Sequence, residues 1–283
     1  IWESLVSAAN RKMSEITVIV DHNKFQSDYA VERTSSLGDL EAKFAAFGWA
    51  VHRLDGHDHG ALMACFDDVR RETDRPSVII ADTVKGKGVS FMEGTAIDSD
   101  VDMFRFHSGA PKADEYQRAV LELETSIAKK LAALNAEPVK IEIEPRPSIS
   151  TPDREQKRLF PAYTQALLGL AEKHKHLIAL DADLILDMGL IEFRDRFPDR
   201  FIECGIAEQD MVSQAGGMAL RGVLPIVHSF SCFLATRPNE QIYNNTTEET
   251  KIVYIGGLSG AIPAGPGHSH QSVREISAIG GVP

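Results

Sequence analysis

The segment 205–209, Gly-Ile-Ala-Glu-Gln, places a carboxylate at the expected start of a helix, directly after the strand-like run 200–204. An acid in the first turn of a helix complements the helix dipole. A carboxyl group at the same place can also share or transfer a proton during catalysis. The spacing alone leaves both roles open for Glu208, and the residues that the fold brings beside it must decide between them.

Polar or glycine-rich segments follow four of the expected strands. They are 21–28, 85–88, 181–183 and 205–209. In open α/β sheets, ligands bind at the carboxyl ends of the strands, so these segments are the candidate binding loops. Asn and Asp after a strand are also ordinary turn formers, and Lys85 and Lys87 fit either a phosphate-binding loop or a solvated one.

Hydrophobic periodicity predicts an alternation of helices and parallel strands along most of the chain. Strands are expected at 16–20, 49–54, 77–83, 177–180, 201–204, 224–227 and 251–255. Helices are expected at 1–10, 40–47, 59–71, 113–134, 158–174, 207–220 and 239–243. This order predicts an α/β fold with two open, mostly parallel sheets.

A proline-rich stretch, 135–157, separates the two halves of the pattern. Its composition is typical of a linker between domains. The expected domains are therefore 1–134 and 158–283, and no internal sequence repeat is visible.

The composition is acidic, with a formal net charge of −11 and a pI of about 5.4. Nucleic acids and anionic membranes usually need a basic surface, so small molecules and proteins are the expected partners. No apolar run reaches the ~18–20 residues that span a bilayer, and the first residues do not have the pattern expected of a signal peptide. Cys65, Cys204 and Cys232 lie far apart with no CxxC pair, which argues against a zinc site or a disulfide framework and fits a reducing cytoplasm.

Motifs along essentially the whole chain resemble one enzyme family. The segments 1–3 (Ile-Trp-Glu), 20–26 (Val-Asp-His-Asn-Lys-Phe-Gln), 55–58 (Asp-Gly-His-Asp) and 83–93 look like the diphosphate-binding domain of transketolases. The segments 205–209, 229–233 (Ser-Phe-Ser-Cys-Phe) and 269–271 (Ser-His-Gln) resemble the pyrimidine-binding domain of the same family, which is related to deoxyxylulose-phosphate synthase. The resemblance implies one diphosphate (PP) domain and one pyrimidine (Pyr) domain.

The resemblance implies binding of thiamine diphosphate with Mg²⁺ or another divalent cation such as Ca²⁺. Such a cation prefers oxygen ligands, and the family pattern assigns the side-chain oxygen of Asn23 and the backbone carbonyl of Phe25 to it. Asp183 matches the family's Ala-Asp-Leu motif near the cofactor. A further metal ligand, the aspartate of Gly-Asp-Gly, belongs upstream of the segment matching 1–3. We therefore expect a partial chain that lacks this segment and the family's C-terminal domain.

Five side chains match the family's reaction centre. Glu208 matches the glutamate that bonds to the far ring nitrogen of the aminopyrimidine and thereby prepares its exocyclic nitrogen to act as a base. Phe230 and Phe233 match the pyrimidine-pocket aromatics, with Phe233 the expected stacking partner, although two core phenylalanines would show the same spacing. His107 and His270 match proton-transferring histidines. A histidine without a catalytic role, in solvent or in the core, would look the same in the sequence.

Departures from the family pattern concern the substrate. The segment 266–271 reads Pro-Gly-His-Ser-His-Gln, where ordinary transketolases have Asp-Gly-Pro-Thr-His-Gln, so the acid that reads substrate hydroxyls is absent. The segment 185–188, Ile-Leu-Asp-Met, lacks the expected serine, and the histidine expected near 256–258 is missing. An acid in place of a phosphate ligand would repel a phosphate dianion. These departures predict an unusual sugar, differently charged or unphosphorylated. His57 also matches the family and is expected to be structural.

The resemblance implies a transferase that moves a two-carbon ketol unit from a ketose or ketose phosphate to an aldose acceptor. Two alternatives stay open: decarboxylative condensation of the deoxyxylulose-phosphate synthase type, and a non-catalytic subunit that retains the fold. Family active sites lie between subunits, which implies a homodimer or a heteromeric complex.

Overall fold

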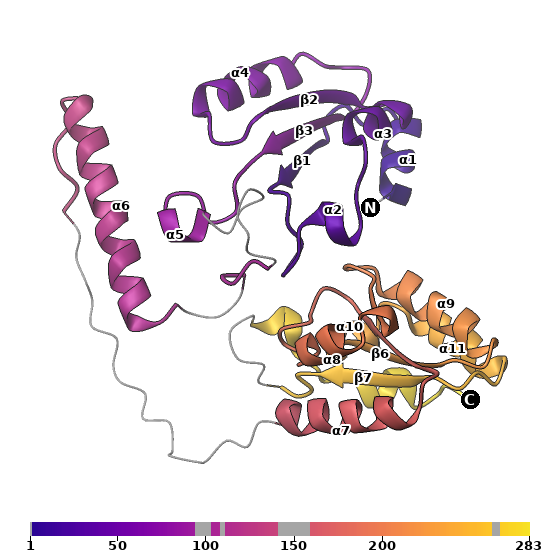
Figure 1. Cartoon of the computed structure of the whole chain (residues 1–283). Coiled ribbons are helices and arrows are strands. Elements are labelled where there is room, and N and C mark those ends of the chain that lie inside the picture. Colours follow the sequence, from indigo (N-terminus) through magenta and orange to yellow (C-terminus); the bar gives the residue numbers. More distant parts are fainter. Residues whose placement is uncertain (1, 94–102, 108–110, 141–158, 262–266) are drawn as a thin grey trace. The chain divides into compact units, whose positions relative to one another are not determined.

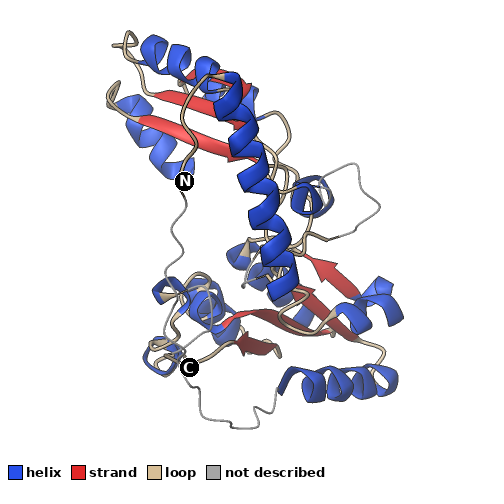
Figure 2. Cartoon of the chain, turned by 90° about the vertical axis from the view of Figure 1, so that its left-hand side faces the viewer, coloured by secondary structure: helices blue, strands red, loops and turns tan. Residues whose placement is uncertain are grey.

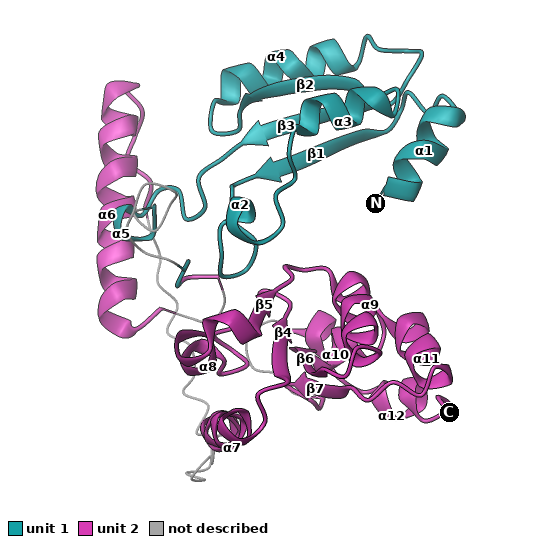
Figure 3. Cartoon of the chain, turned by 45° about the vertical axis from the view of Figure 1, so that its right-hand side comes forward, with its two compact units in different colours: residues 1–105 teal, residues 106–283 magenta. Residues whose placement is uncertain are grey.

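The computed structural model describes residues 2–93, 103–107, 111–140, 159–261 and 267–283 (Figure 1). It divides into two compact units, residues 1–105 and residues 106–283 (Figure 3). Each unit contains one parallel sheet flanked by helices (Figure 2).

The first unit has a three-stranded parallel sheet in the order β1-β3-β2. Its strands are β1 (Thr17–His22), β2 (Ala50–Asp55) and β3 (Ser77–Asp82). Ser77 pairs with Thr17 on one side and Ala50 on the other, so the carboxyl ends of the three strands lie at the same edge. The helices are α1 (Trp2–Asn10), α2 (Val31–Thr34), α3 (Leu40–Ala46), α4 (His59–Val69) and α5 (Ser90–Glu93).

The central strand β3 is buried on both faces, as its continuous apolar run requires in a parallel sheet. Successive strand side chains point to opposite faces. Val78 and Ile80 belong to one core cluster with residues of α1 and α3, whereas Ile79 packs with Cys65 and Val69 of α4. The two faces of the sheet are therefore covered by different helices.

The second unit has a four-stranded parallel sheet in the order β5-β4-β6-β7. Its strands are β4 (Leu177–Asp181), β5 (Phe201–Glu203), β6 (Leu224–Phe230) and β7 (Val253–Gly257). Its α-helices are α6 (Ala113–Ala133), α7 (Leu159–Lys173), α8 (Ile191–Arg196), α9 (Glu208–Ala219), α10 (Ser231–Leu234), α11 (Asn239–Thr247) and α12 (Glu275–Ile279). Short 3-10 turns span Pro198–Arg200 and His268–His270.

The second sheet is also covered on both faces. Leu180 and Val227 pack in one cluster with Met211 of α9. The ring of His228, the next residue of β6, is bonded instead to Tyr163 of α7. α9 and α7 therefore lie on opposite faces, and the carboxyl ends of the strands between them form the edge that carries the candidate site.

The predicted fold class, two open and mostly parallel α/β sheets, is confirmed. The predicted strands and the longer helices lie within a few residues of the observed ones. The short helices α2, α5, α8, α10 and α12 are not predicted, because four to six residues carry too little periodicity.

The expected linker, 135–157, is described only in part. Residues 141–157 lie outside the described residues, and residues 136–140 form neither helix nor strand. The boundary between the compact units falls at residue 105, so α6 goes with the second unit although the sequence pattern groups it with the first half.

Candidate active site

Glu208 is the first residue of α9 and is only 4% exposed. Its Oε1 accepts hydrogen bonds from Arg237 Nη1 at 2.7 Å and from Ser229 Oγ at 3.3 Å. Two donors converge on one buried carboxylate at the carboxyl edge of the sheet. The carboxylate of Glu208 therefore has specific side-chain partners in addition to its position at the start of a helix.

The backbone before Glu208 is fixed by a second acid, Glu203, at the end of β5. Glu203 Oε1 accepts the N–H of Gly205 at 2.9 Å and the N–H of Asp183 at 2.8 Å. Gly205 has φ 69°, a left-handed conformation that suits glycine. Burial raises the pKa of Glu203 to about 7, against the lowering effect of these two bonds. Sequence reasoning missed Glu203; an acid that ends a strand before glycine is the available signal.

Asp183 is fully buried in the turn that follows β4. It has φ 60°, an uncommon conformation for a residue other than glycine. Asp181 Oδ2 accepts the N–H of Leu184 at 2.7 Å and closes the same turn. The loops after β4 and β5 are therefore held together by buried carboxylates, and Asp183 lies beside the loop that leads to Glu208.

An aromatic group forms the other side of the site. Phe230 ends β6, and Phe233 lies in α10 directly after it. Their ring centroids are 6.1 Å apart, and the His270 ring meets Phe233 edge-on at 4.9 Å and Phe230 at 5.7 Å. A Cβ on Gly256 of β7 would lie 3.0 Å from the Ser231 Cβ, so this glycine lets α10 pack closely on the sheet.

His270 lies against these rings, where the charges of Arg237 and Asp187 act on it. Burial lowers the pKa of His270, and the positive charge of Arg237 lowers it further, whereas Asp187 opposes the shift. The imidazole is thus poised to be neutral and able to accept a proton near neutral pH. The structure brings Glu208 and Phe233 to a common partner, Arg237, and Phe230 and His270 to Phe233.

His107 is exposed in the short described stretch 103–107. Its role stays a prediction. Asn23 and Phe25 belong to the first unit, and their role as metal ligands stays a prediction.

Asn23 and Phe25 lie in a tight turn after β1. Asn23 Oδ1 accepts the N–H of Phe25 at 3.0 Å, and Asn23 Nδ2 donates to Asp21 Oδ2 at 3.1 Å. Phe25 forms an antiparallel bridge with Ala30, but the flanking residues supply its bonds: Val31 N–H donates to the Lys24 carbonyl at 2.9 Å. In such a pair the carbonyl of Phe25 itself points away from the bridge.

The turn is held by an ion-pair cluster around Asp82, at the end of β3. Asp82 is bonded to Arg53, Lys24 and His22. Arg53, followed by Lys24 and His22, holds the pKa of Asp82 far below its usual range despite partial burial. Lys24 has φ 72° and also donates to the His22 carbonyl at 2.6 Å. Sequence reasoning missed this cluster, because only the β1-β3-β2 strand order brings its members together.

The glycine-rich loop 85–88 is tied down by side chains. Lys85 Nζ donates to the carbonyls of Gln26 at 2.6 Å and Ser27 at 3.1 Å, and Lys87 pairs with Glu93 at 3.1 Å. His57 Nε2 accepts the N–H of Val84 at 2.9 Å, a structural contact. Lys85 therefore connects this loop to the loop that carries Asn23, rather than standing in solvent.

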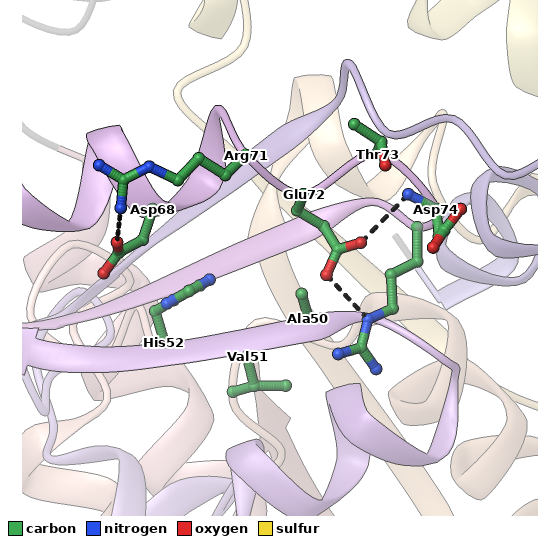
Figure 4. Close-up of a pocket in the computed structure, with 9 residues that line it drawn as sticks. Ala50, Val51, His52, Asp68, Arg71, Glu72, Thr73 and Asp74 are labelled. Carbon is green, nitrogen blue, oxygen red and sulfur yellow. Dashed lines mark hydrogen bonds and ion pairs between the residues drawn. The ribbon is translucent and has the colours of Figure 1, made fainter.

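A polar hollow lies at the amino end of β2, away from these residues (Figure 4). It is lined by Ala50, Val51, His52, Asp68, Arg71, Glu72, Thr73, Asp74 and Arg75. Two of its cations are paired with its own acids, Arg71 with Asp68 at 3.1 Å and Arg75 with Glu72 at 3.2 Å. None of the predicted site residues lines it, and ligands of open α/β sheets bind at the opposite edge.

The donor set suits a hard cation and a flat ring. Within the described ranges, no three His, Cys, Asp or Glu side chains could hold a metal ion among themselves. The predicted ligands are instead an amide oxygen and a backbone carbonyl, the types that Mg²⁺ and Ca²⁺ accept. In the other unit, the planar guanidinium of Arg237 lies over the Phe233 ring and donates a hydrogen bond to Glu208. The space between these two residues therefore accommodates a flat hydrogen-bonding group.

Comparison with known proteins gives both units the same relatives. Residues 2–115 match the model of the transketolase thiamine diphosphate binding domain, and residues 156–283 match that of the transketolase pyrimidine binding domain. The chain is 28% identical over 293 residues to Transketolase-like protein 2 of Mus musculus and to Transketolase of Homo sapiens, covering 100% of this chain and 45% of each relative. The solved transketolase of Campylobacter jejuni is 18% identical, with a TM-score of 0.40, covering 100% of this chain and 48% of that chain.

The two matched domains define a protein of the thiamine-diphosphate-binding class. The chain belongs to the transketolase family, as its motifs predict. It spans a little under half the length of the curated relatives. None of the helices in the described part of the chain is long and apolar enough to cross a bilayer.

Proposed function

We propose that the chain is part of a transketolase-like enzyme that transfers a two-carbon ketol unit from a ketose donor to an aldose acceptor with thiamine diphosphate. The observation that carries the proposal is the buried carboxylate of Glu208, which shares the planar partner Arg237 with the face of Phe233. Family membership supports the cofactor class.

The chain's residues divide the binding of the cofactor between the two units. Asn23 and Phe25 would hold Mg²⁺, or another divalent cation such as Ca²⁺, at the diphosphate. Phe233 would stack on the aminopyrimidine, and Phe230 would wall the pocket. Glu208 would bond the far ring nitrogen, and Asp183 would hold the loop beside it. When bound, the thiazolium supplies an electron sink for breaking and forming carbon–carbon bonds.

The histidines would handle the substrate's hydroxyl protons. His270 has a lowered pKa, so a large fraction of it is neutral at pH 7 and able to take a proton from a hydroxyl group. His107 is proposed for the same task from the family pattern. Glu208 would act on the cofactor ring and not on the sugar, so the three residues have separate proton-transfer positions.

The substrate is proposed to be a sugar without a phosphate at the position where Asp187 faces it. The charge of Asp187 reaches His270, since it shifts the pKa of that ring. A carboxylate there would repel a phosphate dianion. The rival reaction, decarboxylative condensation, would use pyruvate as donor; carbon dioxide release that requires pyruvate would replace the proposed reaction with this one.

The complete protein is proposed to be a homodimer or a heteromeric complex whose active site combines Asn23 of one subunit with Glu208 of another. The transketolase family supports this assembly. A cytoplasmic location, expected from the composition, stays a prediction. The non-catalytic alternative predicts that the complete protein fails to bind the cofactor.

The test uses the complete natural protein, titrated calorimetrically with thiamine diphosphate and Mg²⁺ and assayed with ketose and aldose pairs. Glu208→Gln keeps the shape of the side chain but removes the acid, so turnover should fall by roughly 10²–10⁴-fold while folding is unchanged. The matched control is Glu240→Gln, which removes an exposed acid from the first turn of α11 and should leave turnover unchanged. Wild-type turnover in Glu208→Gln would refute the assigned role.

A further inference from the structure

Arg237 makes two contacts that define a flat binding place. Its Nη1 donates to Glu208 Oε1 at 2.7 Å, and its Cζ lies 3.8 Å from the centroid of the Phe233 ring. A guanidinium is planar, stacks on aromatic faces and donates hydrogen bonds in its own plane. The same group therefore covers the ring and bonds the carboxylate.

These contacts are the two that the aminopyrimidine would need under the function proposed above. Phe233 is the residue proposed to stack on that ring, and Glu208 is the residue proposed to bond it. The aminopyrimidine and the guanidinium cannot both cover the same face of Phe233, so the guanidinium must leave that face before the ring can stack there. Because Glu208 is 4% exposed, its carboxylate also needs a partner when no ring is present.

We propose that Arg237 is a built-in substitute for the aminopyrimidine, which pairs Glu208 and covers Phe233 until the cofactor ring displaces it. This inference rests on the proposed function. It adds a residue that sets cofactor affinity by competition from within the chain.

The side chain of Arg237 is placed to leave without disturbing the fold. It is 40% exposed, so the guanidinium can turn into solvent. The backbone stays fixed, because the Arg237 N–H donates to the Phe233 carbonyl at 2.9 Å and the next residue, Pro238, is buried. Displacement therefore breaks one ion pair and one ring contact and leaves α10 in place.

If Arg237 competes with the cofactor, removing its side chain should change cofactor affinity in the direction opposite to that expected from its charge alone. Removal of a cation from a site for an anionic cofactor should weaken binding of that anion. Removal of a competitor should strengthen it, since apparent affinity is reduced by the fraction of molecules in which the place is taken. The direction of the change in the dissociation constant therefore separates the two roles of Arg237.

The experiment measures the dissociation constant of thiamine diphosphate, with saturating Mg²⁺, for the complete protein by calorimetry. Arg237→Ala and Arg237→Met are compared; Met keeps an unbranched stem over Phe233 but has no donor. Both should bind the cofactor about 5- to 50-fold more tightly than wild type. The control, Arg221→Ala, removes an exposed cation at the end of α9 and should not tighten binding.

A second measurement uses guanidinium chloride at about 20 mM as a probe of the vacated place, against sodium chloride at the same ionic strength. Free guanidinium should weaken cofactor binding to Arg237→Ala competitively and have little effect on wild type. Unchanged or weaker cofactor binding in both Arg237 variants, when wild type binds, overturns the inference and leaves the proposed function standing. Absence of binding in wild type and in both variants overturns both. Binding by the variants alone supports the inference.

Discussion

Glu203 accepts the backbone N–H of Asp183 at 2.8 Å and thereby joins the end of β5 to the turn after β4. The same oxygen accepts the N–H of Gly205 at 2.9 Å. One carboxyl group thus orients both the loop that carries Asp183 and the loop that leads into Glu208. Its ionisation is the natural point at which pH acts on the geometry of the candidate site.

Glu203→Gln should change how stability depends on pH while keeping the loops in place. The carboxamide oxygen can accept the same two N–H groups, but it cannot ionise. Burial raises the pKa of Glu203 in the folded protein from 4.5 to about 7. Between these values the folded state binds more protons than the unfolded state, so this group lowers stability as the pH rises. The variant should therefore gain stability relative to wild type between pH 5 and pH 8, as measured by urea unfolding.

The matched control for this prediction is Glu240→Gln, an exposed acid in the same unit. Its stability difference from wild type should be nearly the same at both pH values. A Glu203→Gln difference that is equally flat would show that Glu203 ionises normally in the folded protein.

His228 should act on stability in the opposite direction. Its Nδ1 lies 2.9 Å from the Leu180 carbonyl and its Nε2 lies 2.5 Å from the Tyr163 hydroxyl, so the neutral ring donates to the first and accepts from the second. Burial lowers the pKa of His228 from 6.5 to about 4. Between these values the unfolded state binds more protons, so stability falls as the pH drops from 6.5 to 4, by about 3 kcal/mol at most.

The variant His228→Asn should be less stable than wild type at pH 7, because it loses ring packing and a buried bond, but its stability should change less on acidification. Unfolding in urea at pH 4.5, 5.5 and 7 measures this. The exposed His176 provides the control, since His176→Asn should retain the wild-type slope. An acid dependence in His228→Asn as steep as that of wild type would assign the loss to another group.

Asn23 offers a test of the proposed metal site in the first unit. Asn23→Ala removes both the proposed ligand oxygen and the bond to the Phe25 N–H. Asn23→Asp keeps an oxygen for that bond and adds a charge. Metal binding by the complete protein with thiamine diphosphate should weaken by roughly 10–100-fold in the alanine variant, a range typical of lost metal-site contacts, and persist in the aspartate variant. Mg²⁺ titration measures both.

The control for the metal site is Asn10→Ala, at the exposed end of α1. It should bind Mg²⁺ as wild type does. Equal weakening in the alanine and aspartate variants would point to damage of the turn and not to loss of a ligand oxygen.

The sequence predicts positions along the chain better than it predicts partners across it. Glu208 is correctly expected at a helix start, because a strand, a glycine and a helix follow one another locally. The bond from Arg237 is not predictable in this way, since it requires the start of α9 and the turn after α10 to meet at one edge of the sheet. The hydrogen bond that Glu203 accepts from Asp183 likewise depends on β4 and β5 being neighbours. Hydrophobic periodicity predicts the fold class. The strand order, which the sequence pattern does not show, determines which polar groups come together.

Asp187 provides the test of substrate charge. Its carboxylate raises the pKa of His270, so its field reaches the proposed proton-transfer site. Asp187→Ser removes the charge and restores the residue type expected for a phosphate ligand. With a phosphorylated acceptor, KM should fall about tenfold or more, because repulsion of the dianion is lost, whereas kcat should change little. With an unphosphorylated acceptor of the same carbon skeleton, KM should stay the same or rise.

Steady-state kinetics of the complete protein measure KM and kcat for the two acceptors. The control is Asp199→Asn, which changes an exposed acid of the same unit. A KM that moves equally for both acceptors would show that Asp187 shapes the site without reading the charge of the sugar.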